Sequence, residues 1–178
     1  MTIGIVIKHV IKDLMAVLAY LPYGLLAGAA VSLMLWVINA KRTKAGKQSL
    51  PLVPVSAFVM YVIIMMCITF WGREGGSTNS IDMKLFSTWG INARNNAYVI
   101  ENILLFMPYG FLGAWMVPNF RNIFAAILLG FVTSTGVEML QLISGRGYFQ
   151  IDDILTNALG TLLGCVLFCV YEKRGHEC

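Results

Sequence analysis

The chain has 178 residues, of which 58% are hydrophobic and only 12% are charged, and its mean hydropathy is +0.74. Soluble domains have about a quarter of their residues charged, so this composition excludes an ordinary soluble protein and predicts a polytopic membrane protein. The formal net charge of +4 does not indicate nucleic-acid binding, because the lysines and arginines stand in short clusters between apolar runs, where they act as topology signals.

Residues 1–13 are predicted to form an amphipathic helix on the membrane interface. Apolar residues recur there at helical spacing on one face, and Lys8 and Lys12 lie on the other face. A cleaved signal peptide is the alternative, because these lysines precede an apolar run that reaches "AGAA". The run continues through Trp36, which favours an uncleaved membrane span.

Five uncharged or nearly uncharged stretches follow, each long enough to cross a bilayer, which takes about 20 apolar residues in a helix. Lipid offers the backbone no hydrogen bonds, so such spans are helical and the sequence predicts an all-α bundle. A long polar loop, residues 73–96, separates the second span from the third. The predicted spans are residues 14–40, 48–72, 97–118, 122–145 and 153–171, within one integral membrane domain covering residues 1–178.

The linker "KRTKAGKQ" after the first span sets the expected orientation. Its Lys41, Arg42, Lys44 and Lys47 are placed in the cytoplasm by the positive-inside rule. Alternation of the five spans then puts the N-terminus and the loop at 73–96 outside the cell, and the C-terminus inside.

Two spans share a short motif that suggests an internal repeat. "LPYGLLAGA" at 21–29 resembles "MPYGFLGAW" at 107–115, and both would place a kinking proline inside an apolar helix. Pro22, Gly24, Pro108 and Gly110 are therefore expected at helix kinks and close contacts. The two helical hairpins would then be parallel copies, unless the likeness is a coincidence of residues common in membrane helices.

Polar residues gather near the end of the fourth span. Glu138 and Gln141 share a helix face, and Gly145 ends that helix, which leaves Glu138 about 10 Å from its outer end. An ionised carboxylate at mid-bilayer costs about 2.5 kcal/mol or more, so it needs a partner, water or a proton. Arg146 is the nearest cation in the sequence and can form a forked pair with a carboxylate.

The fifth span begins with two aspartates. Asp152 is expected to cap the helix or hold the loop, whereas Asp153 is expected to face the bundle, on a stripe that continues through Asn157. An asparagine on such a stripe more often forms a hydrogen bond between helices than a ligand contact, although Asn157 is kept as a ligand-binding candidate. Gly160 and Gly164 form a small-xxx-small pattern that lets another helix approach closely.

The third span adds Arg94, Glu101 and Asn102 at the same level, with Asn102 chosen to face inward. The outer side then holds more carboxylates than cations, so a carboxylate is protonated, a cation is bound, or the site faces water. The sequence thus predicts an outward-facing polar pocket, with Glu138 and Asp153 as candidates for catalysis. Its predicted ligand-binding residues are Arg94, Asn102, Glu138, Gln141, Arg146, Asp152, Asp153 and Asn157.

No metal site is predicted, and the sequence does not identify a cofactor. Cys67, Cys165, Cys169 and Cys178 show no CxxC or Cys/His spacing, and three of them lie in or near apolar runs, which favours reduced, buried thiols.

The polar pattern resembles the VanZ-like family. That pattern is an Asn before F-x-P-x-G, then E-x-x-Q near a helix end, an Arg, an Asp that opens the next helix, and an Asn followed by glycines. Within residues 94–171 the matching residues are Asn102, Phe106, Pro108, Gly110, Glu138, Gln141, Arg146, Asp153, Asn157, Gly160 and Gly164. The resemblance implies a bacterial plasma-membrane protein and a theme of resistance to teicoplanin and related lipoglycopeptides, without naming a reaction.

The favoured function is that of a membrane accessory protein whose pocket binds or remodels a cell-envelope lipid or a lipid-anchored ligand. Expected partners are membrane lipids, and cell-wall lipid intermediates or lipoglycopeptide antibiotics, but not nucleic acids. The alternatives are an enzyme acting on a lipid-linked substrate, with Glu138 as general acid or base, and a small transporter or flippase. Five spans are few for a transport pathway, so a transporter would require a homo-oligomer. A purely structural role for the polar residues also stays open.

Overall fold

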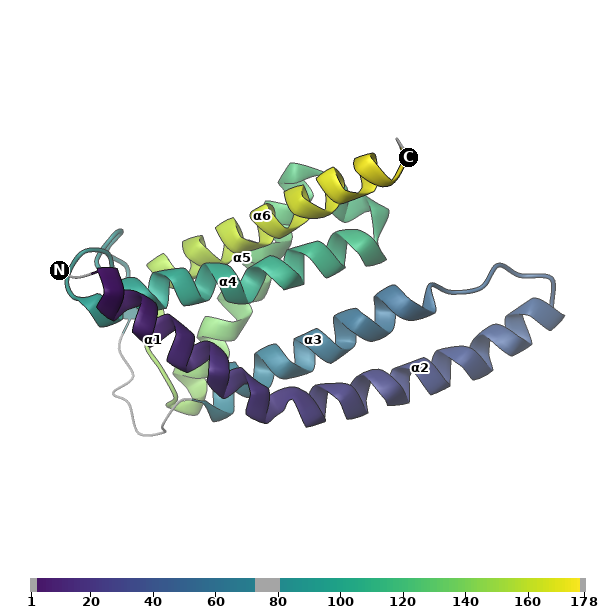
Figure 1. Ribbon diagram of the computed structural model, residues 1–178, viewed down its shortest axis with the longest axis horizontal. Coiled ribbons are helices and arrows are strands. Elements are labelled where there is room, and N and C mark those ends of the chain that lie inside the picture. The colour runs from purple at the N-terminus through teal and green to yellow at the C-terminus, as the bar shows by residue number, and fades with distance from the viewer. Residues whose placement is uncertain (1–2, 73–80, 177–178) are drawn as a thin grey trace.

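A computed structural model describes residues 3–72 and 81–176 of the chain, and it is almost entirely helical (Figure 1). The helices are α1 (Ile3–Ala16), α2 (Leu21–Lys44), α3 (Leu52–Trp71), α4 (Ala93–Met116), α5 (Ile123–Ser144) and α6 (Ile151–His176). Two 3-10 turns, η1 (Val17–Tyr20) and η2 (Pro118–Arg121), and two-residue strands β1 (Ile81–Asp82) and β2 (Phe149–Gln150) complete it. Among the described residues, five helical segments are long and apolar enough to cross a membrane. The predicted all-α bundle of about five spans is confirmed.

Helical structure continues without a coil break from Ile3 to Lys44, a stretch of 42 residues. A continuous helix of that length would measure about 63 Å, roughly twice the thickness of the hydrocarbon. Instead, η1 turns the chain, and α1 packs across the start of α4, with Val6 and Val10 against Ala97 (Figure 1). The first helix therefore leaves the direction of α2 at η1, a few residues beyond the predicted boundary at residue 13.

Pro22 lies at the start of α2, whereas the shared motif predicted a proline inside a helix. The backbone N–H groups in the first turn of a helix have no partner within the helix. Proline, which lacks an N–H, therefore loses no helical hydrogen bond at this position. Pro108 does lie inside α4, as expected. The Tyr61 hydroxyl of α3 donates to the carbonyl of Leu105, three residues before Pro108, at 2.5 Å. The neighbouring helix α3 thus supplies a hydrogen bond at the point where Pro108 disturbs the backbone hydrogen bonds of α4.

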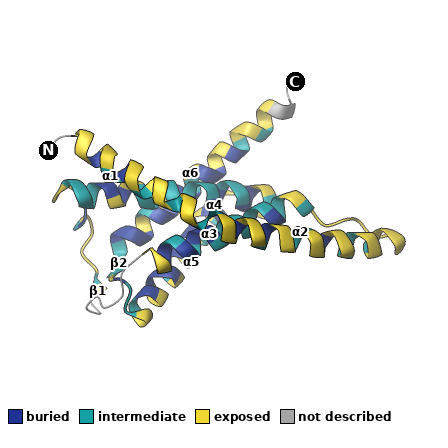
Figure 2. Cartoon of the chain, turned by 60° about the horizontal axis from the view of Figure 1, so that its bottom comes forward, coloured by how far each residue is buried: buried dark blue, intermediate teal, exposed yellow. Residues whose placement is uncertain are grey.

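The two predicted copies of a helical hairpin are α2 with α3 and α4 with α5, and they pack differently. An internal repeat would predict the same packing in both. α2 packs along α3, and Gly24 lets the two helices meet at Ile64. In contrast, α4 and α5 have few contacts with each other, because both pack on α6. Figure 2 shows exposed residues along most of α2, while buried positions concentrate where α4, α5 and α6 meet.

Three glycines bring α4 and α6 into backbone contact. A Cβ atom added at Gly110 would overlap the carbonyl of Thr161, and one added at Gly164 would overlap the carbonyl of Met107. Gly160 faces the carbonyl of Ile103 in the same way. The small-xxx-small pattern therefore marks the α4–α6 interface, and both helices run in the same direction (Figure 1).

The helix ends differ from the predicted spans by a few residues. Capping residues set several of these ends. α4 begins at residue 93, after Asn92, whose side chain accepts from the N–H of Asn95 at 2.8 Å. α5 begins after Asn122 and ends at Gly145, which adopts a left-handed conformation with φ of 65°. α6 starts at residue 151 and runs to residue 176, beyond the predicted end at 171. Of the predicted loop, residues 73–80 lie outside the described part of the chain.

Candidate functional site

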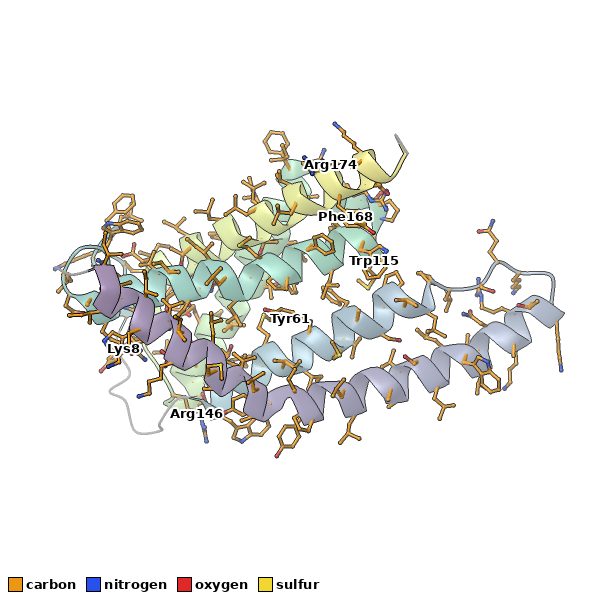
Figure 3. All side chains as sticks on the ribbon, in the orientation of Figure 1. Lys8, Tyr61, Trp115, Arg146, Phe168 and Arg174 are labelled. Carbon is orange, nitrogen blue, oxygen red and sulfur yellow. The ribbon has the colours of Figure 1, made fainter. Side chains whose placement is uncertain are left out.

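The candidate site lies at the end of the bundle where α3 and α5 finish and α4 and α6 begin, called here the site end. Arg146 lies in the half of the molecule that also holds Lys8, whereas Phe168 and Arg174 lie in the other half (Figure 3). α5 and α6 run antiparallel there, and the Asn157 side chain donates from Nδ2 to Ser134 Oγ at 2.7 Å. Both side chains are buried, with exposed fractions of 3% and 0%.

One turn closer to the site end, this register brings Glu138 of α5 opposite Asp153 of α6. Both carboxylates are buried. Glu138 Oε2 accepts from the backbone N–H of Gln150 at 3.1 Å, which ties α5 to β2. The two candidates for catalysis are thus on facing helices and shielded from solvent.

α3 closes the cluster from a third side through its last carbonyls. Gln141 donates from Nε2 to the carbonyl of Thr69 at 3.2 Å, and Arg146 donates from its guanidinium to the carbonyl of Phe70 at 2.7 Å. This bond uses one nitrogen of the guanidinium, and the pairing of Arg146 with a carboxylate stays a prediction. The end of α3 has carbonyls without helical partners, and a guanidinium satisfies one of them. We call Ser134, Glu138, Gln141, Asp153 and Asn157 the buried polar cluster.

Asp152 holds the loop that precedes α4. Its two carboxylate oxygens accept from the backbone N–H of Phe86 at 2.7 Å and that of Thr88 at 2.9 Å. β1 also pairs with β2 in parallel, Ile81 beside Phe149. The sequence expectation that Asp152 serves the cap or the loop agrees with these bonds.

A second aspartate shapes the same loop from outside the spans. The Asp82 carboxylate accepts from the backbone N–H of Lys84 at 3.0 Å and from the Ser87 hydroxyl at 2.7 Å. The Lys84 amide first, and then the Ser87 hydroxyl, hold the pKa of Asp82 below its usual value.

Two further predicted residues lie on α4, Arg94 in its first turn and Asn102 further along the helix. Arg94 pairs with Asp13 of α1 at 2.6 Å and stacks over the Tyr98 ring, 4.5 Å from its centroid. It therefore fixes α1 on α4. Asn102 is partly buried in α4, and its Nδ2 atom has no hydrogen-bond partner among the described residues.

Cavities at this end lie elsewhere and are mainly apolar. The first cavity, of about 210 Å³, lies between α1 and α4 beside Trp89. The second cavity, of about 190 Å³, lies between α4, α6 and the loop that precedes α4. Asp152 lines the second cavity, and no other residue of the predicted ligand-binding set lines either of them. Glu138, Gln141, Asp153 and Asn157 line neither of these two cavities and are buried. An outward-facing polar pocket formed by them stays a prediction.

The chemistry available in the cluster is hydrogen bonding and proton exchange. Within residues 3–72 and 81–176, no group of three or more histidine, cysteine or acidic side chains has the arrangement of a metal site. Sequence reasoning missed Ser134, although its spacing of four residues from Glu138 puts both on one helix face. It also missed the carbonyls of α3, which carry no side-chain pattern.

The model of the VanZ/LLP1 family matches residues 58–172, well over half of the chain. The chain belongs to the VanZ/LLP1 family. The matched region runs from within α3 to α6, so it contains the whole buried polar cluster and the described part of the loop between α3 and α4. It confirms the VanZ-like family and a multi-pass membrane protein.

A similar protein is Protein VanZ of Enterococcus faecium, which is 31% identical over 103 residues. Those residues are 55% of this VanZ/LLP1 chain and 58% of that relative, so the two match over little more than half of either protein. No solved structure matches the chain significantly.

Proposed function

We propose that this protein binds a lipid-linked or lipid-anchored cell-envelope ligand at the site end, and that this binding lowers the susceptibility of the cell to teicoplanin-type lipoglycopeptides. In this proposal the site end faces outward and the linker at 45–51 faces the cytoplasm. The ligand class is that of cell-wall lipid intermediates or of the antibiotic itself, and the polar cluster supplies hydrogen bonds to its hydroxyl, amide or amine groups.

The observation that carries the proposal is the burial of five polar side chains inside a membrane bundle. A charged side chain at the centre of a membrane helix costs about 2.5–3.5 kcal/mol, so such residues are rare and usually functional. Glu138 and Asp153 are 2% and 5% exposed. Packing alone would be served as well by apolar residues at these positions.

An incompletely satisfied amide gives further support. The Oδ1 atom of Asn157 is buried and has no hydrogen-bond partner among the described residues. Most buried polar atoms in proteins are paired, and an exception calls for a reason, such as a role in binding. This acceptor lies one turn deeper than Glu138 and Asp153 on the same interface.

The relatives contribute the physiological theme. Members of the VanZ-like family are linked to teicoplanin resistance, and the similarity to Protein VanZ extends over 55% of this chain and 58% of that relative. The resistance role is therefore proposed for this chain together with its binding site.

The test is the inhibitory concentration of teicoplanin in a susceptible Gram-positive host that expresses the chain. We compare the wild type with Glu138→Gln, Asp153→Asn and Arg146→Ala at matched membrane levels. Glu172→Gln is the matched control. Glu172 lies away from the site end, where it forms an ion pair with Arg121 over a distance of 2.8 Å.

We expect the wild type and Glu172→Gln to raise the inhibitory concentration, and Glu138→Gln, Asp153→Asn and Arg146→Ala to lose this effect. If the wild type gives no protection, the resistance role is wrong. If all variants protect as well as the wild type, the cluster only holds helices together and the binding proposal fails.

A further inference from the structure

The second cavity has features of a site for hydrocarbon. Val99 and Ile103 of α4 form one wall and Leu155 and Leu159 of α6 form the other. Both leucines are exposed by 40% or more, so the cavity opens on the side of α6 that faces away from the protein. Because these residues belong to helices that are long and apolar enough to cross a membrane, we expect this opening to face lipid instead of water.

The depth of the cavity is limited by the glycine contacts. At Gly160 and Gly164 the backbones of α4 and α6 touch, and no chain can lie between the helices there. Above these contacts larger side chains face each other and leave the space of about 190 Å³. From Asp152 to Leu159 the groove follows seven residues of helix, a length of about 10 Å.

The mouth of the cavity is formed by two aromatic side chains from the loop before α4. Phe86 and Trp89 both line it, although the loop leaves them 74% and 63% exposed overall. Phe86 has a positive φ of 61°, which a bulky residue rarely adopts. The two backbone hydrogen bonds accepted by Asp152 hold it there.

Aromatic residues at this level match the preference of tryptophan for the membrane interface, where one side of the ring meets hydrocarbon and the other meets polar groups. The site thus has an apolar channel, a closed lower end and an amphipathic aromatic mouth held by a buried aspartate.

We infer that this groove holds the part of one phospholipid acyl chain nearest the polar head, and that Asp152 is the residue that positions the aromatic mouth over it. The occupant enters sideways from the bilayer, with its polar head at the level of Trp89 and its chain beside Leu155 and Leu159. This assignment is separate from the buried polar cluster, which lies on the side of α6 that faces α5, so it goes beyond the proposed function.

The test uses the full chain in liposomes that contain a small fraction of phosphatidylglycerol with a photoreactive group in its acyl chain. After illumination, mass spectrometry maps the labelled residues. Leu159→Trp fills the groove, and Leu163→Trp is its matched control, because Leu163 lies one turn further along the exposed side of α6 and does not line the cavity. Asp152→Asn weakens the hold on the loop.

We expect labelling to concentrate on the cavity lining, to fall severalfold in Leu159→Trp and Asp152→Asn, and to persist in Leu163→Trp. Even labelling along the exposed side of α6 in the wild type would identify ordinary surrounding lipid and overturn the inference. So would labelling that survives in Leu159→Trp. Elution as a single species in size-exclusion chromatography shows that each variant is folded, and Asp152→Asn with undiminished labelling would remove the positioning role.

Discussion

At the scale of single residues, hydrogen bonds between α5 and α6 replace contacts that a soluble core would make with apolar side chains. Lipid is as apolar as leucine, so helices in a membrane gain little from burying hydrocarbon against one another, and polar pairs and close packing matter more. The bond between Asn157 and Ser134 is of this kind, since both side chains are buried at the centre of the interface.

This bond gives the first prediction. Asn157→Ala should lower the free energy of unfolding by about 0.6–1.7 kcal/mol, the range for such bonds between membrane helices. Detergent-mediated unfolding followed by circular dichroism measures the difference. Thr135→Ala is the control, because the Thr135 hydroxyl bonds to the Phe131 carbonyl of its own helix. If both variants lose the same stability, the bond between α5 and α6 does not hold the helices together.

How far the sequence predicted the site also depends on the residue. Spacing placed Glu138 and Gln141 on one face of a helix, and that face is buried. The same reasoning could not find the partner of Arg94, because Asp13 lies 81 residues earlier and reaches it only when α1 packs on α4. Nor could it find the carbonyl of Phe70, since backbone acceptors leave no pattern in the sequence.

At the scale of elements, the pairing of α4 and α6 depends on glycine. Helix periodicity predicts which face of a helix carries small residues, but it does not identify the helix that fills the space. Gly160 and Gly164 were predicted as contact residues, and their partner is α4, more than 40 residues earlier in the chain. The repeat suggested pairing between consecutive helices, whereas α6 lies between α4 and α5.

The second prediction tests this interface. Gly160→Ala should destabilise the protein by about 1–3 kcal/mol, because the added methyl group would meet the Ile103 carbonyl and overpacking has costs of this size. The control is Gly136→Ala on α5, where an added Cβ meets nothing within 4 Å. Its effect should stay within about 1 kcal/mol in the same unfolding assay, as expected for an exposed helical glycine. Equal losses in the two variants would show that α4 moves away at little cost.

The loop before α4 gives a third prediction, on pH. The pKa of Asp82 is lowered in the folded loop by the Lys84 amide and the Ser87 hydroxyl. The carboxylate therefore contributes its stability at any pH above its unfolded value of about 3.9, and this contribution is lost as the pH falls below that value through the folded pKa.

Cleavage of the loop is the measurement, since local opening governs cleavage. A neutral protease is used near neutral pH and an acid-active protease in acid, each normalised to its rate on an unfolded substrate at the same pH. In the wild type the susceptibility of the loop should be constant from neutral pH to about pH 5 and rise only below about pH 4. Asp82→Asn should be more susceptible at neutral pH, and the gap between the two proteins should close in acid. A gap that is independent of pH would mean that the Asp82 charge does not hold the loop.

At the scale of the whole molecule, the direction in which the bundle crosses the membrane decides what the buried polar cluster can bind. The cluster lies at the end where α4 and α6 begin, and the basic linker between α2 and α3 lies at the other end (Figure 1). Lysine and arginine in short loops favour the cytoplasm. The proposed function therefore requires the loop at 81–92 to be outside the cell.

The fourth prediction tests that direction with single cysteines, in a background whose native cysteines are replaced by alanine. Lys84→Cys in the loop should react with a membrane-impermeant maleimide in intact cells, whereas Lys44→Cys, at the end of α2, should react only after the membrane is permeabilised. Both lysines are exposed, so a difference in labelling reports the side of the membrane and not burial. The reverse pattern would put the cluster at the cytoplasmic face, where an extracellular antibiotic does not reach it, and the ligand would then have to be sought among lipid precursors made inside the cell.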